Sequence, residues 1–356
     1  MPSLFDPITL RGVTTRNRIW LAPMCQYSVE ARDGVPTDWH LVHLGARATG
    51  GFGLVMTEAA AVTPEGRISP QDAGIWSDEQ AAAWSRITAF LRAEGAVPAI
   101  QLAHAGRKAS RLAPWEGDGP AEDGWEAVGP ADVPFQGYAT PRGLAQPEIA
   151  EIVTAFADAA RRADAVGFDV VELHAAHGYL LHQFLSPLSN LRTDSYGGSF
   201  ENRIRIVLEA ADAVRAALPD HKALLVRLSA ADWVEGGWTV EETVELSALL
   251  AGHGVDLVDV SSGGLDARQA ITIGPGYQVP FARDVRQKAG VPSGAVGLIT
   301  DPAQAQAILD EGSADVVLLA RAALREPGWP QRAAHELGVP GPYPVQYTRG
   351  AWRRPT

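Results

Sequence analysis

Cysteine is nearly absent from the sequence, since Cys25 is the single cysteine in 356 residues. One thiol cannot close an intramolecular disulfide, build a structural zinc site of cysteines or ligate an iron–sulfur cluster. We therefore expect that any redox chemistry of this chain depends on another kind of cofactor.

Basic residues are also scarce. The chain has 30 lysines and arginines against 42 aspartates and glutamates, which gives a formal net charge of -12. A chain of this charge repels nucleic acids and anionic membrane surfaces. The balance favours a small-molecule partner and predicts neither nucleic-acid nor membrane binding.

Long apolar runs are missing as well. The first residues, MPSLFDPITLRGV, lack the charged start and apolar stretch of a secretory signal, and no run reaches membrane-spanning length. These absences predict a cytoplasmic location. With 46% hydrophobic and 20% charged residues, the composition is that of a globular protein with an ordinary core.

Short apolar runs rich in branched residues recur along the chain, and helix-period segments fit between them. The expected strands are residues 19–22, 54–57, 97–102, 170–173, 224–228, 257–261, 295–298 and 316–319, and the expected helices are 78–92, 148–165, 200–217 and 240–250, the last capped by Thr239. No Gly-x-Gly-x-x-Gly turn follows the first strand, so a closed (β/α)8 TIM barrel is favoured over a doubly wound sheet.

The chain length suits one barrel with insertions. A minimal (β/α)8 barrel needs roughly 250 residues, so little room is left for a second domain and we expect a single domain over residues 1–356. The segment 105–146 is too long for an ordinary loop after the third strand and is rich in Gly and Pro. It is interpreted either as a lid over the barrel mouth or as a plain surface loop.

In such a barrel the active site forms just after the carboxyl ends of the strands, so polar or distinctive residues at these points are the candidates. In chain order they are Pro23, Met24, Cys25 and Tyr27, then Glu58 and Ala59, then Gln101, then His174, His177 and Tyr179, then Arg227, Gly297 and Arg321. These side chains are predicted to meet at one mouth.

His174 and His177 are three residues apart, which lets both imidazoles face one small object. A metal ion is one alternative, but zinc needs a third ligand, and the first strand offers Met24 and Cys25 where barrel hydrolases usually place His-x-His. A pair of donors to a carbonyl oxygen that gains negative charge explains the spacing better. Two structural histidines are the plain alternative. Tyr179 could protonate a carbanion at the same place, or simply pack.

Arg227 lies at the end of an apolar strand, where burial is costly without an anionic or electron-rich partner. Gly297 and Arg321 follow the seventh and eighth strands, where many barrels hold a phosphate group. A cofactor phosphate and a phosphorylated substrate of a lyase or isomerase both suit these residues.

Several longer blocks connect the candidates: NRIWLAPMCQYS, TEAAAVTPEGRI, QLAHAGRKA, FDVVELHAAHGYLLHQFLSPLSNLRTDSYGGSFENR, VRLSAADW and AVGLI. Together they resemble the Old Yellow Enzyme family of flavoproteins over residues 4–352. The Pro-Met-Cys sequence at Cys25 and the C-terminal VQYTRG are similar to the thermophilic-like branch, which includes bacterial ene-reductases and xenobiotic reductases.

The resemblance implies FMN as cofactor and NADPH or NADH as reductant. For the flavin, the resemblance implies a lining of Pro23, Met24 and Ala59, a hydrogen bond from Gln101 to the pyrimidine edge, and Arg227 facing N1–C2=O. The phosphate would be held by Gly297 and Arg321. The substrate carbonyl would be bound by His174 and His177, Tyr179 would donate the proton, and Cys25 with Tyr27 would shape the pocket and tune the flavin. The implied reaction is ping-pong reduction of activated C=C bonds in unsaturated aldehydes and ketones, maleimides and nitroalkenes.

In that branch an arginine near the C-terminus reaches the neighbouring active site. Arg349 or Trp352, in the tail 340–356, occupies the matching place, which implies a homodimer or homotetramer. Two departures are Ala320, where Gly is expected beside the phosphate, and Ala351, which separates Gly350 from Trp352.

Three other functions remain open from the residues. A flavin barrel of this kind could act on another electrophile, such as a nitro compound or nitrate ester. It could also be a noncatalytic flavin store or sensor. From a different class, the histidine pair could belong to a metal-dependent barrel hydrolase.

Overall fold

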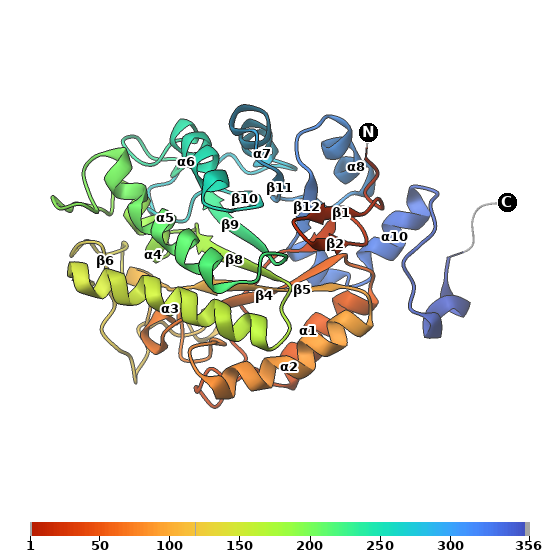
Figure 1. Cartoon of the computed structure of the whole chain (residues 1–356), viewed down its shortest axis with the longest axis horizontal. Coiled ribbons are helices and arrows are strands. Elements are labelled where there is room, and N and C mark those ends of the chain that lie inside the picture. Colours follow the sequence, from red (N-terminus) through yellow and green to blue (C-terminus); the bar gives the residue numbers. More distant parts are fainter. Residues whose placement is uncertain (1, 118, 353–356) are drawn as a thin grey trace.

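Eight parallel strands close into a barrel in the computed structural model, which describes residues 2–117 and 119–352 (Figure 1). In chain order they are β3 (Ile19–Leu21), β4 (Leu54–Ala61), β5 (Val97–Ala103), β8 (Val170–Ala175), β9 (Ala223–Ser229), β10 (Leu257–Ser261), β11 (Ser293–Ala295) and β12 (Val316–Leu319). Val317 of β12 pairs with Ile19 of β3 and closes the ring. The predicted (β/α)8 barrel is confirmed.

The prediction for the seventh strand was wrong in position. It placed the strand at residues 295–298, whereas β11 ends at Ala295. Gly297 has φ of 118° and Leu298 has φ of 51°, both left-handed conformations that a strand does not contain. The run Ala-Val-Gly-Leu therefore marks the exit of the strand into a turn.

Helices cover the outside of the barrel. α2 (Asp78–Ala93), α3 (Gln146–Ala165), α5 (Phe200–Ala217) and α6 (Val240–Gly252) lie where they were predicted, and the side chain of Thr239 caps α6. Others were not predicted: α1 (Asp38–Thr49), α4 (Leu180–Leu185), α7 (Val279–Asp284), α8 (Pro302–Asp310), α9 (Arg321–Arg325) and α10 (Trp329–Glu336). In α1 the capping box uses His40 where Glu or Gln is usual, so its sequence signal is weak.

Apolar side chains fill the lower part of the barrel interior. Trp20, Met56, Leu225 and Leu318 form one buried cluster there with other strand residues. An N-terminal hairpin of β1 (Ile8–Leu10) and β2 (Val13–Thr15) adds Leu10 to this cluster. Polar chemistry is thereby restricted to the carboxyl ends of the strands.

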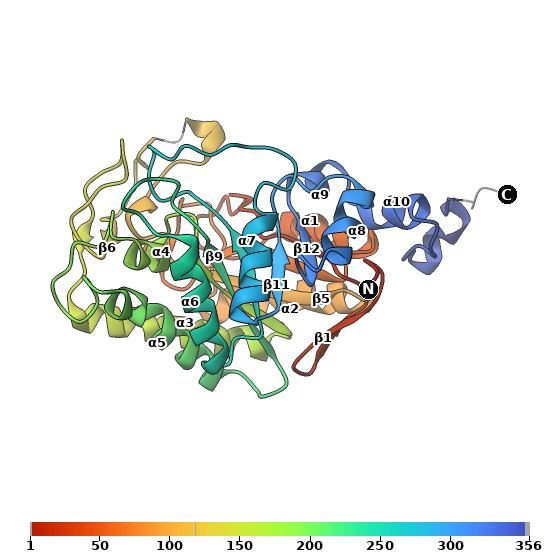
Figure 2. The ribbon, with the colours of Figure 1, turned by 90° about the horizontal axis from the view of Figure 1, so that it is seen from above.

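The excursion between β5 and α3 contains the short helical turns η2 (Gly106–Lys108) and η3 (Pro114–Glu116) and the paired strands β6 (Val128–Gly129) and β7 (Arg142–Gly143). Arg107 donates to the carbonyl of Leu265, and Lys108 Nζ donates to the carbonyl of His177 at 2.9 Å. Figure 2 shows this segment on the same side as the loop that follows β10. The excursion is therefore attached to the mouth.

Beyond α10 the chain continues as a tail with one helical turn, η5 (Val345–Gly350), at the edge of the molecule (Figure 1). Tyr347, Arg349 and Trp352 are exposed there. Residues 353–356 of the expected tail lie outside the described residues. Within the described ranges, none of the helices combines the length and apolar character that crossing a bilayer requires.

Candidate active site

Strand register brings several predicted residues to one level of the barrel. Ala59 pairs with Gln101, Gln101 pairs with Glu172, and His174 pairs with Arg227 across neighbouring strands. Gln101 and Arg227 are buried, with 2% and 5% of their surface exposed. The polar side chains therefore form a layer directly above the apolar interior.

His174 and His177 lie together as predicted. Their ring centroids are 5.2 Å apart, and the ring of Tyr179 lies 5.0 Å from that of His174. Burial, followed by the positive charge of Arg227, holds the pKa of both histidines well below its usual range. Both imidazoles are therefore neutral at physiological pH, and each carries one N–H donor.

The hydrogen bonds identify the donor on His174. Its Nδ1 accepts the backbone N–H of Ala176 at 3.3 Å, so Nε2 carries the proton. His177 Nε2 lies 2.7 Å from Ser261 Oγ, a contact that the sequence did not suggest. His177 also has φ of 58°, a left-handed backbone that the surrounding loop must hold in place.

A fully buried pair supports this loop from below. His182 Nδ1 accepts the N–H of Gly178 at 2.9 Å, and His182 Nε2 lies 2.9 Å from Asp232 Oδ1. Gly178 has φ of 74°, and a Cβ there would lie 2.3 Å from the carbonyl oxygen of Gly264. Sequence reasoning missed His182 and Asp232, because His182 lies in a largely apolar helix and resembles a core residue.

The residues after β3 form one wall of the mouth of the barrel. Cys25 is half-buried, and desolvation, followed by the nearby carboxylates of Asp72 and Glu58, holds its thiol pKa well above the usual range. The thiol is therefore neutral. Tyr27 is half-buried beside it, and its ring meets Trp115 of the excursion edge-on at 5.6 Å.

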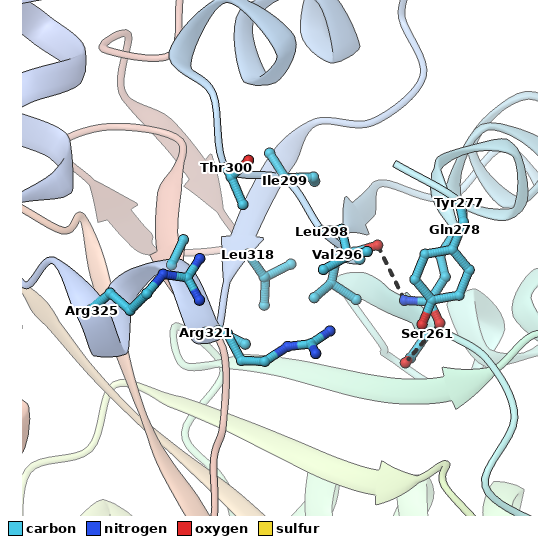
Figure 3. Close-up of a pocket in the computed structure, with 13 residues that line it drawn as sticks. Ser261, Tyr277, Gln278, Val296, Leu298, Ile299, Thr300, Leu318, Arg321 and Arg325 are labelled. Carbon is cyan, nitrogen blue, oxygen red and sulfur yellow. Dashed lines mark hydrogen bonds between the residues drawn. The ribbon is translucent and has the colours of Figure 1, made fainter. Parts of the chain in front are cut away.

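A cavity of about 160 Å³ opens at the carboxyl ends of β11 and β12. It is lined by Ser261, Tyr277, Gln278, Val296, Gly297, Leu298, Ile299, Thr300, Leu318, Ala320, Arg321, Ala322 and Arg325. Figure 3 shows Arg321 and Arg325 on the α9 side and Tyr277 and Gln278 on the other. Two guanidinium groups make this cavity suitable for a phosphate. Arg325, Tyr277 and Gln278 were not predicted.

Gly297 and Ala320 line the cavity, and their backbone conformations differ. A Cβ on Gly297 would lie 2.9 Å from Gln278 Nε2, and the φ of 118° disfavours any other residue. Ala320 has φ of -104°, on the negative side that L-residues favour, and ψ of -96°. The φ of Ala320 is therefore not of the left-handed kind that requires glycine.

These features fit FMN. The cavity with Arg321 offers a site for one phosphate, and the layer containing Gln101 and Arg227 offers an amide and a guanidinium to a flavin ring. Within residues 2–117 and 119–352, no three His, Cys, Asp or Glu side chains converge as metal ligands would.

Within the part of the chain that the structure describes, Arg349 and Trp352 do not contact the candidate site of their own chain. The ring of Trp352 meets that of His335 at 4.9 Å, and its backbone N–H donates to Tyr343 Oη. Both views place this tail away from α4 (Figures 1 and 2). A role at an active site would require a neighbouring subunit.

Solved structures with the same fold include two reductases and an old yellow enzyme homologue. Morphinone reductase has a TM-score of 0.80 and 31% identity, with 96% of this chain and 91% of that chain covered. The old yellow enzyme homologue from Zymomonas mobilis has a TM-score of 0.78 and 29% identity, with 100% of both chains covered. For a 2-naphthoyl-CoA reductase the values are 0.86 and 27%, with 95% of this chain covered; this chain spans only 52% of that one.

Sequence relatives are more similar still. The NADPH dehydrogenase of Geobacillus thermodenitrificans is 48% identical over 351 residues, and that of Bacillus subtilis is 44% identical over 348 residues; each match covers 98% of both chains. Residues 3–339 match the NADH:flavin oxidoreductase / NADH oxidase family. The expected Old Yellow Enzyme resemblance is confirmed, and the chain belongs to this family of FMN-dependent, NAD(P)H-consuming oxidoreductases.

Proposed function

We propose that this oxidoreductase reduces activated C=C bonds, which are polarised by an adjacent carbonyl or nitro group. The observation that carries the proposal is the cluster of His174, His177 and Tyr179, whose rings lie 5.0 and 5.2 Å apart. Two neutral N–H donors and a phenol at one place suit a substrate that gains negative charge on oxygen and a proton on carbon.

Each of these side chains has a separate task. His174 Nε2–H and the Nδ1–H of His177, whose Nε2 contacts Ser261 Oγ, bind the carbonyl or nitro oxygen and stabilise its developing charge. The Tyr179 hydroxyl gives its proton to the α-carbon. FMN held by Gln101, Arg227 and Arg321 would supply the hydride chemistry at the β-carbon with NAD(P)H as the reductant, so the two substrates would use one site in turn.

The remaining assignments follow the position of each residue at the mouth. We assign flavin contacts to Pro23, Met24, Cys25, Ala59, Gln101 and Arg227, phosphate contacts to Gly297 and Arg321, and the substrate pocket to Tyr27, His174, His177 and Tyr179. Residues 105–146 serve as a lid. The exposed Arg349 and Trp352 extend to the site of a neighbouring subunit in a homodimer or homotetramer.

A visible spectrum under anaerobic conditions tests the proposal. The purified protein should show a flavin band that NADPH bleaches and cyclohexenone restores. Failure of cyclohexenone to restore the band, while a nitroalkane or nitrate ester does so, would assign the enzyme to another electrophile. A band that no electrophile restores would indicate a flavin store or sensor. Family membership already removes the barrel hydrolase alternative.

Replacement of Cys25 by alanine should leave FMN bound and lower its reduction potential by about 10–30 mV. The neutral thiol can donate one weak hydrogen bond, worth ~0.5–1.5 kcal/mol, to a flavin that becomes negative on reduction. Potentiometric titration of both proteins measures the shift. An unchanged potential would remove the tuning role and leave Cys25 as a pocket residue.

Replacement of Gly297 by alanine should weaken FMN binding about 10- to 100-fold. The new Cβ would lie 2.9 Å from Gln278 Nε2, and the left-handed backbone would add strain of ~1–3 kcal/mol. Gly252→Ala is the control, because its Cβ would meet nothing within 4 Å. Fluorescence titration of the apoproteins with FMN measures both; equal affinities would place the phosphate elsewhere.

A further inference from the structure

Four buried polar side chains occupy consecutive strands inside the barrel: Gln101 on β5, Glu172 on β8, Arg227 on β9 and Asp259 on β10. Glu172 and Asp259 have no exposed surface. Gln101 Nε2 donates to Glu172 Oε1 at 2.8 Å, and Arg227 Nε lies 3.0 Å from Asp259 Oδ2. Within the described residues, Glu172 Oε2 and both Asp259 oxygens have no hydrogen-bond partner, so Asp259 is held by the charge of Arg227 alone.

The charges of this layer do not balance if both acids are ionised. Two carboxylates would face the single guanidinium of Arg227, which is paired with Asp259. The other four barrel strands, β11 (SGA), β12 (VVLL), β3 (IWL) and β4 (LVMTEAAA), contain no Lys or Arg. His174, two residues above Glu172, is held neutral by burial and by Arg227. A buried, unpaired carboxylate costs several kcal/mol, so a bound proton removes the imbalance.

We propose that Glu172 is a protonated carboxylic acid at neutral pH and acts as a positioning residue, which orients the Gln101 amide and keeps the layer beneath the flavin electrically neutral. The proposal rests on the proposed flavin contacts of Gln101 and Arg227. Because Asp259 is the acid in contact with the guanidinium, it retains its charge and Glu172 takes the proton.

The electrostatics agree with this division. Burial, followed by the negative charge of Asp259, raises the pKa of Glu172 to about 8. Burial also raises the pKa of Asp259, and the positive charge of Arg227 acts to lower the pKa of both acids. An ionised Glu172 would place net negative charge beside the flavin edge that becomes anionic on reduction. Its proton therefore favours the reduced cofactor.

Glu172→Gln is the direct test, since glutamine keeps the shape of the protonated acid and still accepts from Gln101. The infrared difference spectrum of wild-type minus Glu172→Gln holoenzyme at neutral pH should contain the carbonyl band of a protonated carboxylic acid. This band should be lost as the pH rises through about 8. A difference spectrum with carboxylate bands alone at neutral pH would overturn the proposal.

Two further readouts separate this role from simple packing. The reduction potential of the wild type should fall more steeply above pH of about 8 than that of Glu172→Gln, whereas parallel curves would contradict the proposal. In Asp259→Asn, Arg227 loses its carboxylate, so Glu172 should ionise and its acid band should disappear; persistence of the band would count against the charge argument. These bands do not depend on enone turnover, so a failed ene-reductase assay leaves the test intact.

Discussion

Tyr179→Phe holoenzyme should be reoxidised by cyclohexenone about 10²–10⁴-fold more slowly than the wild type after NADPH has reduced it, since a positioned general acid contributes a factor of this size. Reduction by NADPH should remain near normal, because it requires no proton from Tyr179. Stopped-flow absorbance under anaerobic conditions measures the two half-reactions separately.

Two contacts place the Tyr179 ring beside the proposed substrate donors. Its ring lies 5.0 Å from that of His174, and Lys108 Nζ lies 5.7 Å from its centroid. Tyr196→Phe is the matched control, because that hydroxyl donates to Glu209 at 2.9 Å on the outside of the barrel. Equal slowing of both half-reactions in Tyr179→Phe would show that the residue binds substrates and is not the proton donor.

The barrel could be predicted because its strands are buried on both faces and leave continuous apolar runs between polar turns. The same rule caused the error at the seventh strand. Val296 and Leu298 are apolar, yet Gly297 and Leu298 have left-handed backbones and belong to the turn that lines the phosphate cavity. Apolar composition does not separate a strand from a buried functional loop.

The first layer of the site could be predicted for a geometric reason: strand ends of a barrel meet at one mouth, so His174, Gln101 and Arg227 could be placed together. The supporting residues could not. His182 and Asp232 lie 50 residues apart in the sequence and matter only through their contact in space. Glu172 carried a usable signal, since an acid within the apolar run Val-Val-Glu-Leu requires a partner or a proton.

Asp232→Asn should lower the free energy of unfolding by about 1.5–3 kcal/mol, the usual worth of a buried hydrogen bond to a charged group. Asp232 Oδ2 accepts from Ser186 Oγ at 2.6 Å and from the N–H of Trp238 at 2.8 Å, while Oδ1 faces His182 Nε2 at 2.9 Å. All three neighbours are donors. In Asp232→Asn, the NH₂ group takes the place of one carboxylate oxygen, so it must face a donor there.

Urea unfolding of the holoenzymes measures this loss, and the chain provides a matched control. Asp212 forms the same type of pair with His253 at 2.7 Å, but its side chain is 59% exposed, so Asp212→Asn should cost less than about 1 kcal/mol. Equal losses would show that Asp232 has no special structural role. The folded Asp232→Asn protein should also react more slowly with enone, because His182 would no longer hold Gly178 between His177 and Tyr179 in one position.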